Sequence, residues 1–86
     1  MVRVTGYGQD GPYASRAGYG SIGEAIGGLR YVTGDPSTAP SRSGISIGDS
    51  LAALFAAIGA LSAFHLAEKT GVGQQLRFSV LTALLR

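Results

Sequence analysis

Residues 44–61, GISIGDSLAALFAAIGAL, decide the fold, because they place one carboxylate, Asp49, directly before a long uncharged run. The run predicts a helix from about Asp49 to Lys69, and the following Gly71 supplies a glycine stop. About 21 residues at 1.5 Å each make a helix of ~31 Å. Large apolar side chains form one stripe of this helix and alanines form the other side. A helix that is apolar all round is expected to be buried, surrounded by protein.

Upstream of this helix the pattern predicts a strand, a loop, a short helix and a second loop. Residues 2–5, VRVT, form a short β-branched stretch that is typical of a strand. Turn residues dominate the next segment, which predicts a long loop. Residues 19–29, YGSIGEAIGGL, have helical spacing, and Ser21 followed by Glu24 resembles a capping box. A second loop, rich in Pro, Ser and Gly, joins this short helix to the long one.

Downstream of the long helix, residues 73–81 alternate apolar Leu76, Phe78 and Val80 with polar neighbours. This alternation predicts a half-buried strand. The last residues, LTALLR, begin another apolar segment that we expect to be helical. The predicted fold class is therefore α/β, in the order strand, loop, short helix, loop, long buried helix, strand, helix.

Composition narrows the function classes. The 86 residues suffice for one small domain, and only 14% are charged, against about 25% in typical soluble domains. The net charge of +2 comes from scattered cations, so we expect no nucleic-acid partner. The chain has no cysteine and one histidine, His65, so we expect no metal site. No signal-peptide pattern is visible, and the Ala-rich long helix favours a soluble core helix over a membrane span, so we expect a cytoplasmic protein without a membrane partner.

The long helix also predicts that something outside this chain covers it. Two short strands and two short helices are too few to wrap a helix of ~31 Å on all sides. Both ends of the sequence also cut through predicted elements. We therefore expect either a piece of a larger protein or a homo-oligomer, a dimer or higher, because an exposed apolar face of this size promotes aggregation.

Two readings of Asp49 follow from the residues alone. A carboxylate at a helix N-terminus caps backbone N–H groups and interacts favourably with the helix dipole. Alternatively, the same carboxylate is a nucleophile of the kind that forms covalent intermediates, with Gly48 beside it allowing a substrate to approach the backbone. The residues alone favour the capping role over the nucleophile.

A family resemblance rests on motifs that occur in one order. They are the GYGQDGP loop, the AGY segment before the short helix, the TG with a Pro-rich loop, the GD that opens the long Ala-rich helix, and the KTGVGQ before the second strand. Together they resemble the family III CoA-transferases of the CaiB/BaiF type, which include formyl-CoA transferase-like enzymes. The similarity covers nearly the whole chain. Because family members are several hundred residues long, it implies that residues 1–86 are a single partial domain, an internal segment of a larger CoA-transferase.

The resemblance implies roles for particular residues. Asp49 matches the family's catalytic aspartate, whose carboxylate attacks an acyl-CoA thioester and then carries CoA as an aspartyl thioester until an acceptor acid takes it. Arg16, Ala17, Gly18 and Tyr19 match the segment that binds CoA and substrate near the thiol end. Related racemases carry a histidine where this chain has Tyr19, so the resemblance favours transferase over racemase. Coenzyme A enters as a thioester substrate, and no bound prosthetic group is implied.

The resemblance also implies an incomplete site. The family's amino-terminal nucleotide-fold portion and a later glycine-rich loop have no counterpart in these residues. We therefore expect the isolated chain to be inactive alone and to bind acyl-CoA only where a complete site forms. Two alternatives stay open: a non-catalytic, self-associating small protein derived from that fold, or a subunit completed by a separate partner.

Overall fold

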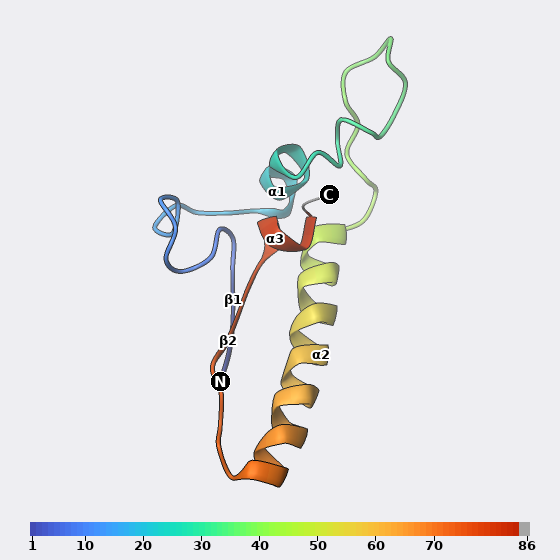
Figure 1. Cartoon of the computed structure of the whole chain (residues 1–86). Helices are drawn as coiled ribbons and strands as arrows, with labels where there is room; N and C mark the ends of the chain where they lie inside the picture. The colour runs from blue at the N-terminus through green and yellow to red at the C-terminus, as the bar shows by residue number, and fades with distance from the viewer. Residues whose placement is uncertain (85–86) are drawn as a thin grey trace.

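The computed structural model describes residues 1–84, and Leu85 and Arg86 of the predicted last segment lie outside them. The elements, in chain order, are β1 (Val2–Thr5), α1 (Gly20–Ile26), α2 (Ile47–Thr70), β2 (Leu76–Ser79) and α3 (Val80–Leu84). This order confirms the predicted α/β succession. In Figure 1 the two strands run along one side of α2, and α1 and α3 lie together at the end where α2 begins.

The two strands form a parallel pair, with Val2 opposite Leu76 and Thr5 opposite Ser79. A parallel pair needs a long crossover connection, and α1, α2 and their loops supply it here. The backbone N–H of Leu76 donates to the Met1 carbonyl at 2.9 Å, which continues the pairing to the first residue. The pair thus places residues 1–5 beside residues 76–79, next to α2.

Helix α2 is longer than predicted at its start and ends where the glycine stop predicts. It begins at Ile47 and runs for 24 residues to Thr70. Gly71 adopts the left-handed conformation, with φ of 73°, and its N–H donates to the Ala67 carbonyl at 2.8 Å. A side chain at this φ would be strained, so the glycine ends the helix.

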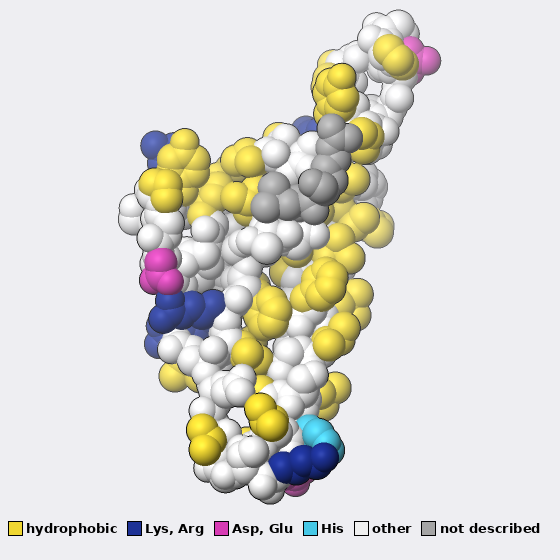
Figure 2. Space-filling model, viewed as in Figure 1, with side chains coloured by type: hydrophobic (Ala, Val, Ile, Leu, Met, Phe, Trp, Pro, Cys, Tyr) yellow, Lys and Arg dark blue, Asp and Glu magenta, His cyan; other side chains and the backbone are white. Residues whose placement is uncertain are grey.

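The faces of α2 divide by side-chain size. Gly48, Ala52 and Ala56 are buried against the rest of the chain, whereas Leu54 and Leu61 are 60% and 72% exposed. The chain itself therefore covers only one face of the helix, in agreement with the prediction that its other elements are too few to wrap it. Small side chains are selected there because the strands and α3 approach closely. Figure 2 shows the hydrophobic side chains that remain exposed along α2.

The described chain is extended rather than spherical. Its radius of gyration is 15.4 Å, against about 12 Å for a compact domain of this length. Its accessible surface is 5966 Å², against about 4,700 Å² for a compact 8.7 kDa monomer. Ala52, Ala56 and Leu84 are the buried apolar residues among 1–84. By length and composition α2 could cross a membrane, a test that core helices of soluble proteins also pass.

The capping box predicted for the short helix is wrong. The N-cap of α1 is Tyr19, and no side chain caps the helix. Ser21 lies inside the helix, and the Glu24 side chain turns inward, where it is only 2% exposed. Tertiary partners, rather than the helix's own N-terminus, engage this carboxylate.

The 27–46 loop joins α1 to α2 and extends away from both helices (Figure 1). A tight turn orders its outer part. The Ser37 N–H and hydroxyl both donate to Asp35 Oδ1, at 2.8 and 2.6 Å. The hydroxyl bond, and then the backbone bond, lower the pKa of Asp35 below its ordinary value of 3.8, because both favour the ionised form.

We expect Ser37→Ala to raise the pKa of Asp35 toward 3.8, because the largest cause of its depression is lost. In the unsubstituted chain, the ionised Asp35 stabilises the turn at pH values above its ordinary pKa. This stabilisation is lost as the pH falls through the lowered pKa of the folded chain. An NMR titration of the Asp35 carboxyl carbon measures the shift. Ser41→Ala, in the same loop, is the control and should leave the titration unchanged. An Asp35 midpoint that does not respond to Ser37→Ala would contradict the assignment.

Candidate active site

The start of α2 meets the start of α1, and Asp49 lies at this junction. A Cβ placed on Gly20 would lie 3.9 Å from Asp49 Oδ2 and 4.0 Å from Oδ1. Any side chain at position 20 would therefore contact the carboxylate. Gly20 directly follows Tyr19, so the structure brings the segment that ends at Tyr19 next to Asp49.

Two glycines make this junction possible. A Cβ on Gly48 would lie 2.7 Å from Leu84 Cδ1, and a Cβ on Gly23 would lie 3.0 Å from the same atom. Val80 Cγ1 is similarly close to both positions, at 3.0 and 3.3 Å. Both helices thus rest on the same pair of α3 side chains, at distances that a larger residue would not allow. This shared support holds Asp49 beside Gly20.

Asp49 itself does not cap α2. The N-cap is Ser46, so Asp49 is the third residue of the helix, and its predicted capping role is wrong. Within residues 1–84 its carboxylate has no hydrogen-bond or ion-pair partner, and the residue is exposed. The first turn of a helix favours negative charge. The carboxylate is therefore accessible, and within residues 1–84 no side chain competes for its oxygens, which leaves them open to attack another group.

The predicted CoA-binding residues lie in two different settings. The Tyr19 carbonyl accepts hydrogen bonds from the N–H groups of Ile22 and Gly23, each at 3.1 Å. The residue itself is 70% exposed. Arg16 instead places its guanidinium carbon 4.3 Å from the centroid of the Tyr13 ring, a cation–π contact. Tyr13 in turn packs edge-on against Tyr7, with the two centroids 5.6 Å apart. Arg16 thus stabilises its own loop.

Gly18 and Ala17 complete the predicted segment. A Cβ on Gly18 would lie 2.7 Å from the Cα of Gly6, so the two ends of the first loop approach backbone to backbone. This contact accounts for a glycine at position 18 without any ligand. Ala17 is exposed. Of the predicted residues, only Tyr19 directly borders the Asp49 junction.

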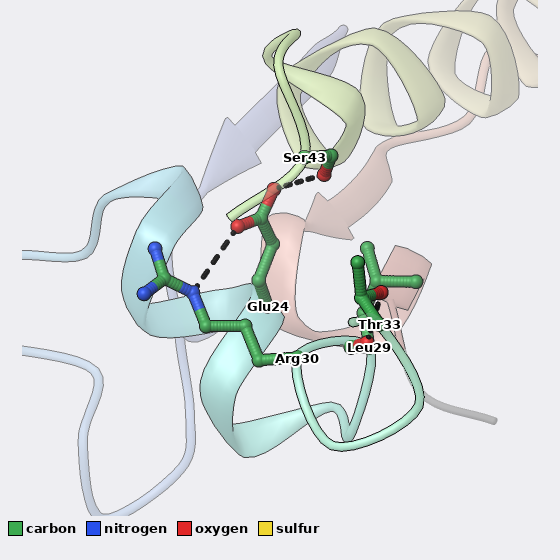
Figure 3. Close-up of polar contacts among 5 residues, drawn as sticks. All are labelled: Glu24, Leu29, Arg30, Thr33 and Ser43. Atoms are coloured by element: carbon green, nitrogen blue, oxygen red, sulfur yellow. Dashed lines mark hydrogen bonds and ion pairs between the residues drawn. The ribbon is translucent and has the colours of Figure 1, made fainter. Parts of the chain in front are cut away.

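Sequence reasoning missed the buried carboxylate of Glu24. Its Oε2 lies 3.4 Å from Arg30 Nε, and its Oε1 accepts a hydrogen bond from the Ser43 hydroxyl at 2.9 Å. Figure 3 shows both partners converging on this one side chain. The available signal was the glycine-rich setting of α1, because glycines inside a helix usually mark a close packing contact. The capping-box pattern concealed it.

Comparison with known proteins supports the resemblance. A family model described as CoA-transferase family III matches residues 1–86. The chain is 55% identical over 85 residues to the succinyl-CoA–D-citramalate CoA-transferase of Chloroflexus aurantiacus, covering 99% of this chain and 21% of that protein. It is 44% identical over 87 residues to the alpha subunit of a succinyl-CoA–L-malate CoA-transferase from Chloroflexus aurantiacus, covering all of this chain and 20% of that subunit.

A solved structure agrees with these sequence matches. The crystal structure of a CaiB/BaiF family protein from Brucella suis has a TM-score of 0.93 and 32% sequence identity, covering 96% of this chain and 22% of that one. The chain spans about a fifth of the length of the curated relatives it matches. With the family model matching from the first residue to the last, the chain belongs to CoA-transferase family III.

Proposed function

We propose that this chain supplies the nucleophile, Asp49, of a CoA transfer between an acyl-CoA and a carboxylic acid. The observation that carries the proposal is the exposed carboxylate of Asp49 beside Gly20, which has no hydrogen-bond or ion-pair partner within residues 1–84, in a chain of this family. The chain acts as an internal segment of a larger transferase, because it spans about a fifth of its relatives. Alone, the 86 residues are expected to be inactive.

The chemistry follows from the carboxylate. An Asp49 oxygen attacks the carbonyl carbon of the thioester, the C–S bond breaks, and sulfur leaves with the electron pair as CoA thiolate. The thiolate attacks the aspartyl carbonyl of the resulting mixed anhydride and releases the donor as its carboxylate. The acceptor carboxylate then attacks the aspartyl-CoA thioester and expels the thiolate. This attack leaves a second mixed anhydride, between Asp49 and the acceptor. The thiolate attacks the acceptor carbonyl of that anhydride, which forms the new CoA thioester and releases the Asp49 carboxylate.

Tyr19 supports a transferase rather than a racemase role for this site. Racemisation needs a base that removes a proton next to the thioester carbonyl, and a phenol is a poor base at neutral pH. Acyl transfer to a carboxylate needs no such proton transfer. We assign the exposed Tyr19, which directly precedes Gly20, as a contact for the thiol end of CoA. Arg16, Ala17 and Gly18 belong to the same proposed contact segment.

Assembly is part of the proposal. Two relatives from Chloroflexus aurantiacus are named as the alpha and beta subunits of one CoA-transferase, at 44% and 39% identity to this chain. The exposed apolar face of α2 is a surface that assembly would cover. We propose a cytoplasmic homo-oligomer, dimer or higher. The same face favours one alternative, a self-associating protein without catalysis, in which Asp49 carries out no chemistry.

The test places the chain in a complete enzyme. In the grafted enzyme, this chain replaces the matching segment of the Chloroflexus aurantiacus succinyl-CoA–D-citramalate CoA-transferase. We expect succinyl-CoA and hydroxylamine together to convert Asp49 to a hydroxamate, located by peptide mass spectrometry. A folded, transfer-active grafted enzyme without a hydroxamate at Asp49 would reject the covalent role. The isolated chain, treated in the same way, is expected to remain unmodified.

A further inference from the structure

Glu24 is the most deeply buried polar side chain in residues 1–84, at 2% exposure. Burying a carboxylate is costly unless it is paired and hydrogen-bonded. Each oxygen of Glu24 has its own partner: Arg30 Nε at 3.4 Å from Oε2, and the Ser43 hydroxyl at 2.9 Å from Oε1. The molecule thus keeps the Glu24 carboxylate buried and paired at one place, and helix capping does not explain why.

The two partners sit at opposite ends of one loop. Arg30 lies near the start of the 27–46 loop, and Ser43 lies near its end, six residues before Asp49. Glu24 therefore anchors both ends of a segment whose outer part extends away from the helices (Figures 1 and 3). The Ser43 hydroxyl bond ties down the chain four residues before α2 begins at Ile47.

The same helix carries the neighbour of Asp49. Gly20 and Glu24 lie four residues apart on α1, so they share one face of that helix. Gly20 borders the Asp49 carboxylate, while Glu24 holds the segment that leads to it. One face of α1 thus contacts both the carboxylate and the chain that positions it.

We propose that Glu24 is a positioning residue for Asp49, acting through Ser43 on the entry into α2. The inference rests on the proposed role of Asp49 as nucleophile. Without the Ser43 anchor, the loop gains freedom directly before the helix, and the carboxylate departs from its place beside Gly20. A misplacement of about 1 Å can cost about 10²-fold in rate, because the attack requires a narrow range of geometries.

The experiment compares two serines in the grafted enzyme. Ser43→Ala removes the hydroxyl that donates to Glu24, while Ser62→Ala removes one that donates to the Ile58 carbonyl at the same 2.9 Å, in the middle of α2. We expect Ser43→Ala to lower kcat by about 10- to 100-fold with little change in KM for succinyl-CoA. Ser62→Ala should match the parent, and Ser43→Thr, which keeps a hydroxyl, should recover most of kcat.

Hydrogen exchange supplies a readout that does not depend on catalysis. Residues 44–50, which include the Ser50 N–H bonded to the Ser46 carbonyl at 3.0 Å, should exchange faster in Ser43→Ala than in Ser62→Ala. The comparison is made in the grafted enzyme and in the 86-residue chain itself. Glu24→Gln, which removes the charge but preserves the volume, should give an intermediate increase in exchange.

The outcomes separate the two proposals. Equal exchange and equal kcat in Ser43→Ala and Ser62→Ala would overturn the positioning role. So would faster exchange without any change in kcat, provided that Asp49→Asn abolishes transfer. Should Asp49→Asn retain transfer, the proposed function itself fails, whereas the exchange measurement still decides whether Glu24 anchors the loop. A lower kcat together with faster exchange in Ser43→Ala, both restored toward the parent values in Ser43→Thr, supports both proposals.

Discussion

Asp49→Asn in the grafted enzyme is expected to lower kcat for CoA transfer by about 10³-fold or more. The substitution keeps the size of the side chain but replaces the attacking carboxylate oxygen with a neutral amide. Loss of a covalent nucleophile in other enzymes costs up to about 10⁶-fold in kcat. Because Asp49 has no hydrogen-bond or ion-pair partner within residues 1–84, the described part of the folded chain loses no hydrogen bond or ion pair. Transfer from succinyl-CoA to D-citramalate, followed by chromatography, measures the effect.

Glu68→Gln is the matched control for this substitution. Glu68 is an exposed carboxylate on the same helix, about 28 Å from Asp49 along the axis. Its replacement also removes one negative charge, so kcat should stay near the parent value. If Asp49→Asn has the same unfolding midpoint as the parent, the loss of CoA transfer comes from the missing nucleophile and not from unfolding. Substantial transfer by folded Asp49→Asn would require a different nucleophile.

Gly27→Ala is expected to destabilise the 86-residue chain by about 2 kcal/mol. A Cβ at this position would lie 2.6 Å from the Leu84 carbonyl oxygen and 2.9 Å from its carbon, and a backbone cannot rotate away as a side chain can. Overpacking of this kind costs about 1–3 kcal/mol or more. Alanine regains at most about 1 kcal/mol through its better helix propensity, so the clash prevails. The clash falls between α1 and α3, whose contact supports the Asp49 junction.

Gly44→Ala tests whether steric contact is the cause. Gly44 lies in the 27–46 loop, and a Cβ there would meet no atom within 4 Å. Because its φ is not positive, alanine should be neutral or stabilising by a few tenths of a kcal/mol. Urea unfolding followed by far-UV circular dichroism compares both variants at one protein concentration, so that association contributes equally. Equal midpoints for Gly27→Ala and Gly44→Ala would refute the packing argument.

Local patterns accounted for the elements. The uncharged run after Asp49 and the glycine at position 71 indicated α2, which extends only two residues further upstream and one further downstream than predicted. Strand alternation in residues 73–81 located β2, but the strand covers only Leu76–Ser79, and the prediction is wrong for Val80 and Leu81, which begin α3. Helix stops and strand alternation depend on residues only a few positions apart, so both signals are visible in the sequence without the structure.

The same local patterns misassigned two carboxylates. Asp49 and Glu24 both stand where helix-capping rules favour an acidic residue, yet neither caps its helix. Asp49 does not cap because α2 begins two residues before it, at Ile47. For Glu24, capping is a weak preference of about 1 kcal/mol, which a tertiary contact readily overrides. For Glu24 the overriding contact joins residues 19 apart, Glu24 and Ser43, and no local pattern encodes such a pair.

The sequence by itself determined the order of elements, the family motifs and the presence of an acid at the start of a long apolar helix. Only the tertiary structure decided which face of α2 packs inward, that Asp49 lies exposed beside Gly20, and that Glu24 is tied to both ends of a loop. The division has a physical cause. Backbone hydrogen bonding and side-chain periodicity act over a few residues, whereas close packing at glycines and buried charge pairing join segments that meet only after folding.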